Sequence, residues 1–151
     1  MRLFSHRYFS KKDLQKISEA IAAAEGSTNG ELRVVIRHRR HWKERKQSLH
    51  ELALGEFYRL GMQNTRDRTG VLILLLLSDR KFQIIADEGI HRRVQDGTWD
   101  EIASQITSHF KRGNFLVGIV EAVKQVGAVL QVHFPRRPDD RNELPDNVVE
   151  N

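Results

Sequence analysis

The chain has 151 residues, no Cys, and 25 Lys and Arg against 20 Asp and Glu, so its formal net charge is +5. This length fits one domain with a full hydrophobic core. The absence of Cys excludes a disulfide scaffold, a Cys-ligated zinc site, an iron–sulfur cluster and a cysteine nucleophile. The most apolar run, Val71 to Leu77, is far shorter than the roughly 20 residues of a membrane span, and the longer stretch 115–134 carries charges. The basic N-terminus has no apolar signal segment, so we expect a cytoplasmic protein.

The first half of the chain predicts a helix, a strand and a second helix. Ser10 followed by Asp13 has the spacing of a capping box, and the apolar residues that follow recur at helical spacing as far as Gly26. The β-branched segment 31–37 predicts a strand. One apolar stripe along residues 43–62 predicts an amphipathic helix.

The second half predicts a hairpin and two further helices. The continuous apolar run 71–77 is typical of a strand that is buried on both faces. A short polar break leads to 82–86, which predicts a third strand. Thr98 with Glu101 predicts the capped start of a third helix, and Asn114 predicts the cap of the last helix.

Together these elements predict an α/β fold, a three-layer α/β/α sandwich with a small mixed sheet. Strand 31–37, helix 43–62 and strand 71–77 form a right-handed crossover, so the first two strands are parallel and the hairpin strand is antiparallel. Helices then cover both faces of the sheet. We expect residues 1–134 to form this single domain and residues 135–151, rich in Pro, Asp and Asn, to form an extended or disordered tail.

The positive charge is concentrated in the first half. Residues 1–68 hold 15 Lys and Arg against 8 Asp and Glu, whereas residues 69–151 hold 10 against 12. The densest basic run, 37–46, contains Trp42, and such a run can bind nucleic acid or an anionic surface. We favour a solvated loop instead, because a basic isoelectric point is common without such a partner, and we do not expect nucleic acid to be the partner.

Several short motifs, taken in their order and spacing, resemble the TPM domain family. They are Thr28-Asn29-Gly30-Glu31-Leu32, Thr69-Gly70-Val71-Leu72-Ile73, Asp79-Arg80-Lys81-Phe82, Ala86-Asp87-Glu88-Gly89-Ile90, Trp99, the run 109–115, Gly118-Ile119, His133-Phe134-Pro135 and the run 140–146. The resemblance covers nearly the whole chain and is to the short bacterial branch without a signal peptide or membrane anchor. Many relatives have Asn where this chain has Thr69, and if that Asn helps to form a site, the resemblance implies that this copy binds its ligand differently.

The topology brings one group of acidic residues to the end of the sheet where the first strand begins. These residues are Glu31, Asp67, Asp87 and Glu88, and His91 lies nearby in the sequence. Carboxylates beside Gly-rich turns suit a hard cation such as Ca²⁺ or Mg²⁺. We favour this site, because the motifs of the family resemblance converge there.

A second candidate site lies at the opposite end of the sheet and gathers Arg37, His38, Asp79 and Arg80. Ligands of open α/β sheets favour the carboxyl ends of parallel strands, which is this end. Asp79 and Asp87 lie roughly 20–25 Å apart along the strand, too far to bind one ion together.

The residues and the resemblance leave three functions open. The favoured one is a TPM domain that binds a divalent cation and acts as an accessory or assembly partner of a membrane-associated protein. The resemblance to a thylakoid member described as an acid phosphatase implies the alternative, a metal-assisted phosphomonoesterase that takes a phosphate-containing ligand. The remaining alternative is an anionic-surface or nucleic-acid binder that uses residues 37–46.

Overall fold

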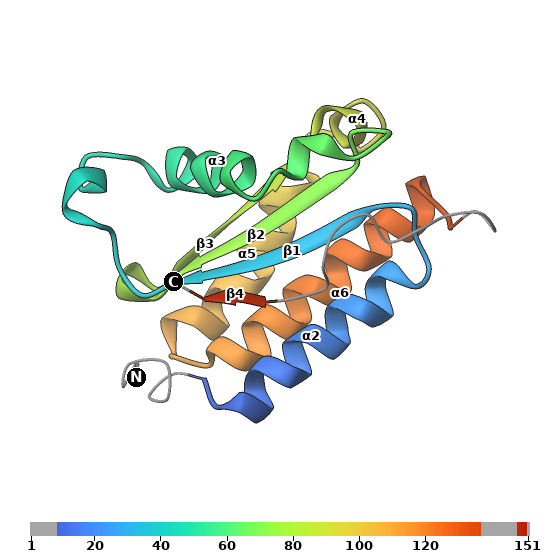
Figure 1. Cartoon of the computed structure of the whole chain (residues 1–151). Helices are drawn as coiled ribbons and strands as arrows, with labels where there is room; N and C mark the ends of the chain where they lie inside the picture. The colour runs from blue at the N-terminus through green and yellow to red at the C-terminus, as the bar shows by residue number, and fades with distance from the viewer. Residues whose placement is uncertain (1–8, 137–147, 151) are drawn as a thin grey trace.

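The computed structural model describes residues 9–136 and 148–150 of the chain. A four-stranded sheet in the order β3-β2-β1-β4 lies between two helical layers (Figure 1). Helices α2, α5 and α6 pack on one face and α3 packs on the other, so the predicted three-layer α/β/α sandwich is confirmed. The elements are α2 (Lys11–Glu25), β1 (Glu31–Arg37), η1 (Trp42–Glu44), α3 (Leu49–Arg59), η2 (Met62–Asn64), β2 (Gly70–Leu76), η3 (Leu77–Asp79), β3 (Lys81–Ala86), α4 (Glu88–His91), α5 (Thr98–Lys111), α6 (Phe115–His133) and β4 (Val148–Glu150), where η marks a short 3-10 helix.

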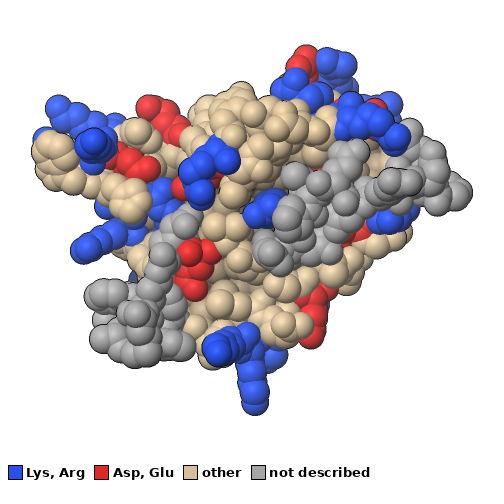
Figure 2. Space-filling view, viewed as in Figure 1, with Lys and Arg blue, Asp and Glu red and all other residues tan. Residues whose placement is uncertain are grey.

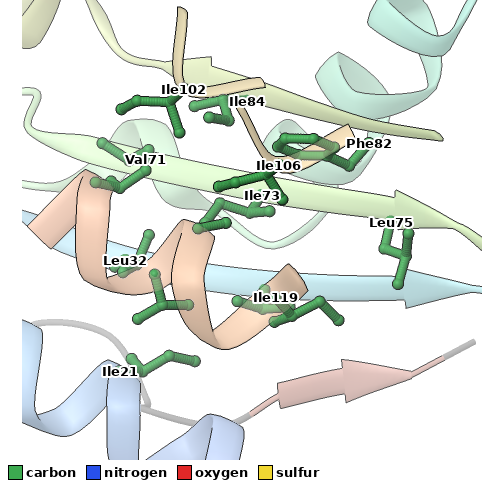
Figure 3. Packing of buried hydrophobic residues seen from close by; sticks show 14 of the residues in the cluster. Ile21, Leu32, Val71, Ile73, Leu75, Phe82, Ile84, Ile102, Ile106 and Ile119 are labelled. Atoms are coloured by element: carbon green, nitrogen blue, oxygen red, sulfur yellow. The ribbon is translucent and has the colours of Figure 1, made fainter. Parts of the chain in front are cut away.

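The central strands carry the core on both of their faces. Strand β1 pairs in parallel with β2, and β2 pairs antiparallel with β3, as predicted. Along β2, Val71, Ile73 and Leu75 face the larger cluster beside α5 and α6 (Figure 3), whereas Leu72 and Leu74 face α3. Burial on both faces explains why β2 is apolar at every position rather than alternating with polar residues.

The start of helix α3 differs from the prediction. The helix begins at Leu49, because Ser48 and Glu51 form a complete capping box. The residues before it form η1, where Trp42 is 73% exposed and the guanidinium of Arg45 lies 4.7 Å from the centre of its ring. The apolar stripe alone could not locate this boundary, because the helix start is set by the hydrogen-bonding cap.

The other predicted caps have mixed outcomes. Ser10 and Asp13 form the predicted capping box of α2. The predicted box at Thr98 is wrong, because the hydroxyl of Thr98 donates to the carbonyl of Gln95 and Gly97 occupies the cap position. Residue 114 does precede the last helix, α6, but makes no side-chain capping bond.

Helix α6 is the one helix of the described chain that is long and apolar enough to cross a membrane by length and composition, with a hydropathy of 1.6. In this fold α6 packs against the neighbouring helices and the sheet, and the side chains that it buries there include Ile119, Val123 and Leu130. The burial of one side of the helix in the core therefore explains its apolar composition.

Strand β4 lies within the segment for which the sequence predicts an extended or disordered tail. Val148–Glu150 pairs in parallel with Val34–Ile36 of β1, on the side away from β2. Residues 137–147 lie outside the described residues. The division of the chain at residues 134 and 135 stays a prediction.

Candidate functional site

The three motifs of the favoured site meet at one end of the sheet, as the topology predicts. Glu31 at the start of β1 is in register with Gly70 at the start of β2. The backbone N–H of Asp87, directly after β3, donates to the carbonyl of Gly70 at 2.8 Å. The motif residues of β1, β2 and β3 therefore lie at the same end of the sheet, beside α4.

Asp87 is buried, and both of its carboxylate oxygens accept hydrogen bonds from the protein. Arg68 donates to them through Nε and Nη2 at 2.8 and 2.9 Å, and the N–H of Glu88 donates to Oδ1 at 2.7 Å and so begins α4. The hydrogen bonds from this guanidinium to Asp87 hold the pKa of Arg68 above its usual value. Arg68 thus lies where a cation bound to Asp87 would have to lie.

The loop that carries Arg68 is held tightly against α4. Arg68 adopts a φ of +56°, and its carbonyl accepts a hydrogen bond from the N–H of Gly89 at 2.9 Å. A Cβ atom at Gly89 would lie 2.2 Å from the carbonyl oxygen of Asp67, so only glycine fits at this position. The close contact and the left-handed backbone indicate a loop whose shape is fixed by packing.

The remaining carboxylates of the predicted cluster do not converge on Asp87. Glu88 is exposed and binds Arg92 at 2.6 Å, and the hydrogen bond from Arg92 lowers the pKa of Glu88. Asp67 is half exposed, and Glu31 is buried at the start of β1. Among the described residues, no three His, Asp or Glu side chains form a group that could hold a metal ion. Binding of a cation by these four residues stays a prediction.

A hollow of about 510 Å³ lies at this same end of the sheet. Its polar lining consists of Asn29, Asp67, Thr69, Arg92 and Arg93, and its floor and walls are completed by Gly89, Phe134 and Pro135. Oxygen-bearing side chains and guanidinium groups therefore border one space, which could accept a cation, an anion or both. Figure 2 shows that Lys and Arg side chains gather around α4, at the upper right of the view.

Thr28 ties the segment before Asn29 to the end of α6, next to this hollow. Its hydroxyl lies 3.1 Å from the carbonyl of Leu130 and 2.5 Å from that of Phe134, and the N–H of Asn29 donates to the carbonyl of Phe134 at 2.8 Å. The guanidinium of Arg93 lies over the ring of Phe134, 5.2 Å from its centre. Asn29 and Arg93 were not among the predicted site residues, although the Thr-Asn-Gly-Glu motif already pointed to Asn29.

Residues at the opposite end of the sheet are committed to internal ion pairs. Arg37 is buried and pairs with Glu44 and with Glu56 of α3. Burial alone would raise the pKa of Glu44, but the hydrogen bonds from Arg37 and from the N–H of His41, together with the positive charge of Arg37, outweigh it and leave this pKa below its usual value. His38 lies 2.8 Å from Glu150 of β4.

Asp79 and Arg80, the other members of this second candidate site, face different partners. Asp79 accepts a hydrogen bond from Arg40 at 2.5 Å, and this bond lowers the pKa of Asp79. Arg80 donates to the carbonyl of Lys111 at 2.8 Å. Two arginines of the basic run, Arg37 and Arg40, are thus engaged within the protein rather than presented to a partner.

The family can be assigned at this point. The family model described as the TPM domain matches residues 5–129. The chain belongs to the TPM domain family. The resemblance read from the short motifs is therefore confirmed.

Solved structures of similar chains support the assignment. The chain is 33% identical to the BA42 protein of the psychrophilic bacterium Bizionia argentinensis, with 94% of each chain covered and a TM-score of 0.84. It shares the fold of the N-terminal domain of a protein from P. gingivalis, at 22% identity, with 86% of this chain and 83% of that chain covered and a TM-score of 0.70. It also shares the fold of the N-terminal domain of a Corynebacterium glutamicum protein, at 13% identity, with coverage of 81% and 74% and a TM-score of 0.61. No curated protein matches the chain in sequence.

Proposed function

We propose that this TPM domain binds Ca²⁺ or Mg²⁺ in the hollow beside α4 and acts as an accessory or assembly partner of a membrane-associated protein. A cytoplasmic location is part of the same proposal. One observation carries the cation-binding role: the oxygen-bearing side chains of Asn29, Asp67 and Thr69 line a single hollow of about 510 Å³ where the family motifs meet.

This set of residues fits a hard cation better than the predicted four carboxylates do, because its members border one hollow. A carboxylate, an amide and a hydroxyl supply oxygen ligands, and Ca²⁺ completes its shell of six to eight oxygens with backbone carbonyls and water. Asp87 fits poorly as a ligand, because Arg68 and the start of α4 already use its oxygens. Since the hollow offers one carboxylate beside two arginines, we expect a dissociation constant near 10⁻⁴ M or weaker, on the order found for the weakest Ca²⁺ modules.

Calorimetric titration with Ca²⁺ and with Mg²⁺ tests this role. Asp67→Asn removes the one carboxylate of the hollow and should abolish the binding heat. Glu101→Gln removes the same charge from an exposed position at the start of α5 and should leave the heat unchanged. Equal heats in wild type and Asp67→Asn, or no heat in any protein, would contradict the proposal.

A phosphate-containing ligand, and with it phosphomonoesterase activity, is the second candidate. Arg92 and Arg93 line the same hollow, and guanidinium groups suit phosphate. A cation bound beside them would polarise a phosphate oxygen and lower the pKa of a bound water. The residues of the chain would hold the phosphate and screen its charge.

Hydrolysis of a chromogenic phosphate monoester, measured with and without added Mg²⁺, tests this second candidate. Arg93→Gln should lower the rate by about tenfold, as expected for the loss of one charged contact. Arg112→Gln, an exposed arginine at the end of α5, is the control. Hydrolysis that survives both Arg93→Gln and Asp67→Asn would place the activity outside the hollow.

A further inference from the structure

The two edges of the sheet end differently. On one side the chain adds its own strand β4 beside β1. On the other side β3 is the last strand in the order β3-β2-β1-β4 (Figure 1). An edge strand presents backbone donors and acceptors that can pair with another chain unless they are covered.

The register identifies which groups of β3 face outward. The N–H of Asp87 donates to Gly70, and hydrogen-bonded pairs recur at every second residue of an antiparallel ladder. Gln83 and Ile85 therefore pair with β2. The backbone N–H and C=O groups of the even-numbered residues of β3 point away from the sheet; these are Phe82, Ile84 and Ala86.

Within the described part of the chain, these three outward N–H groups donate no hydrogen bond to another residue. The carbonyl of Ile84 accepts one long contact, 3.4 Å, from the side-chain amide of Gln83. The edge thus offers donors and acceptors at the two-residue spacing of an extended backbone.

A hollow of about 430 Å³ runs along this edge and is lined by residues 83–86. Leu54 of α3 borders it on one side, and Val94 and Trp99 border it on the other. Leu54 and Trp99 are half-buried, so each leaves part of its apolar surface in the hollow. An added strand would find its backbone partners on β3 and apolar contacts for its side chains on both faces.

The charged side chains that line this hollow are negative, whereas the whole protein is positive. Asp96 and Asp100 line the hollow and are exposed, although the chain as a whole has a net charge of +5. Complementary charge sets which partners dock and how fast they associate. The groove therefore favours a segment that carries Lys or Arg.

We propose that the open edge of β3 receives an extended, basic peptide segment of a partner protein as an added strand. Strand addition of this kind takes its affinity from backbone hydrogen bonds and its specificity from alternating side chains. The inference rests on the partner role proposed above and names its surface and its ligand. It does not depend on the cation, because residues of the β3 edge and of the cation hollow form separate linings.

The probe is the synthetic peptide Thr-Val-Lys-Val-Thr-Val-Lys with blocked ends. Two control peptides carry N-methyl groups, each on one of the two alternating sets of amides. Only one set can face β3, so one control should lose about tenfold or more in affinity and the other should bind nearly as the parent does. Asp96→Asn with Asp100→Asn should weaken binding and flatten its dependence on salt.

Amide hydrogen exchange followed by NMR locates the added strand. On peptide binding, exchange at Phe82, Ile84 and Ala86 should slow by about tenfold or more, whereas exchange at Gln83 and Ile85 should not change, because their N–H groups already pair with β2. No binding of the parent peptide, equal binding of both methylated peptides, or unchanged exchange at the three outward amides would overturn the inference. Protection of these amides without peptide, together with a dimer in sedimentation, would assign the edge to a second copy and also overturn it.

The same protein samples are titrated with Ca²⁺. If the peptide fails to bind while the Asp67-dependent heat persists, only the strand-addition inference falls. If wild type gives no heat on Ca²⁺ titration but binds the peptide, only the cation-binding role is refuted.

Discussion

Arg68 is predicted to act as a built-in counter-charge for the buried carboxylate of Asp87. The pair joins the loop before β2 to the start of α4 through two hydrogen bonds of 2.8 and 2.9 Å. Arg68→Ala removes both bonds. Asp87, which is 6% exposed, then keeps the N–H of Glu88 as its hydrogen-bond donor within the described part of the chain. The expected result is a folded but less stable protein.

The magnitude follows from burial and backbone geometry. A hydrogen bond to a charged group contributes about 1.5–3 kcal/mol, so two give about 3–6 kcal/mol when fully buried. The side chain of Arg68 is 44% exposed, and solvent screening reduces the loss to about 2 kcal/mol. Arg68→Gly loses the same bonds but relieves the left-handed φ of +56°, which costs other residues about 1 kcal/mol. The glycine variant should therefore be about 1 kcal/mol more stable than the alanine variant.

Urea unfolding followed by circular dichroism measures these free energies if the transition is two-state. Asp87→Asn keeps a side chain able to begin α4 but removes the charge. A double-mutant cycle with Arg68→Ala then isolates the pair and should give a coupling of about 1–2 kcal/mol. If Arg68→Ala were as stable as wild type, within about 0.5 kcal/mol, the ion pair would contribute no net stability and the reasoning would be refuted.

Two smaller predictions test packing and charge elsewhere in the fold. Gly118→Ala should destabilise the protein by about 1–3 kcal/mol, because the new Cβ would lie 2.4 Å from the ring of Phe110. Gly55→Ala on α3 should stabilise it by about 0.5–1 kcal/mol, because the new Cβ would meet no atom within 4 Å and alanine favours the helix. Thermal unfolding of both variants and of wild type measures these differences. The hydrogen bond from Arg40 lowers the pKa of Asp79 below its usual 3.8. The stability that this ion pair contributes is therefore fully present above pH 3.8 and is lost as the pH falls through the pKa of Asp79 in the folded protein. Asp79→Asn should therefore lower the free energy of unfolding by about 0.5 kcal/mol at pH 7 and by progressively less as the pH falls below 3.8 in urea titrations. A difference between the two proteins that grew on acidification would contradict this sign.

The sequence was sufficient to predict the layers of the fold, because these depend on patterns that a chain carries locally. The apolar run of β2 and the β-branched run of β1 predicted two buried strands, and the crossover rule predicted that they are parallel. The start of α3 was predicted too early, because the polar residues 43–48 do not themselves mark a boundary and the capping box of Ser48 with Glu51 sets the first turn. Strand β4 was not predicted, because Val148–Glu150 is a short strand whose stability depends on a partner, β1, more than a hundred residues away.

For the site, the sequence predicted the location better than the ligands. Topology alone brought Glu31, Gly70 and Asp87 to one end, and the register confirms that geometry. The pairing of Asp87 with Arg68 depends on an arginine in a left-handed backbone conformation, which spacing rules do not predict. The positions of acidic residues in the sequence thus indicate where negative charge gathers in the fold. Whether a metal ion is needed there depends on the positively charged side chains nearby, which is Arg68 in the case of Asp87.

The mixed lining of the hollow leads to one more prediction. If a cation lies on the side of Asp67 and a phosphate group on the side of Arg92 and Arg93, each ligand lowers the electrostatic cost of binding the other. By linkage, inorganic phosphate must then tighten Ca²⁺ binding by the same factor by which Ca²⁺ tightens phosphate binding. We expect a factor of about 5–20, which titrations of each ligand with and without the other can measure. Because Arg93→Gln removes a positive charge that favours phosphate and opposes Ca²⁺, it should weaken the coupling and leave Ca²⁺ alone binding at least as tightly as in wild type. Independent binding of the two ligands in wild type would show that they do not share the hollow.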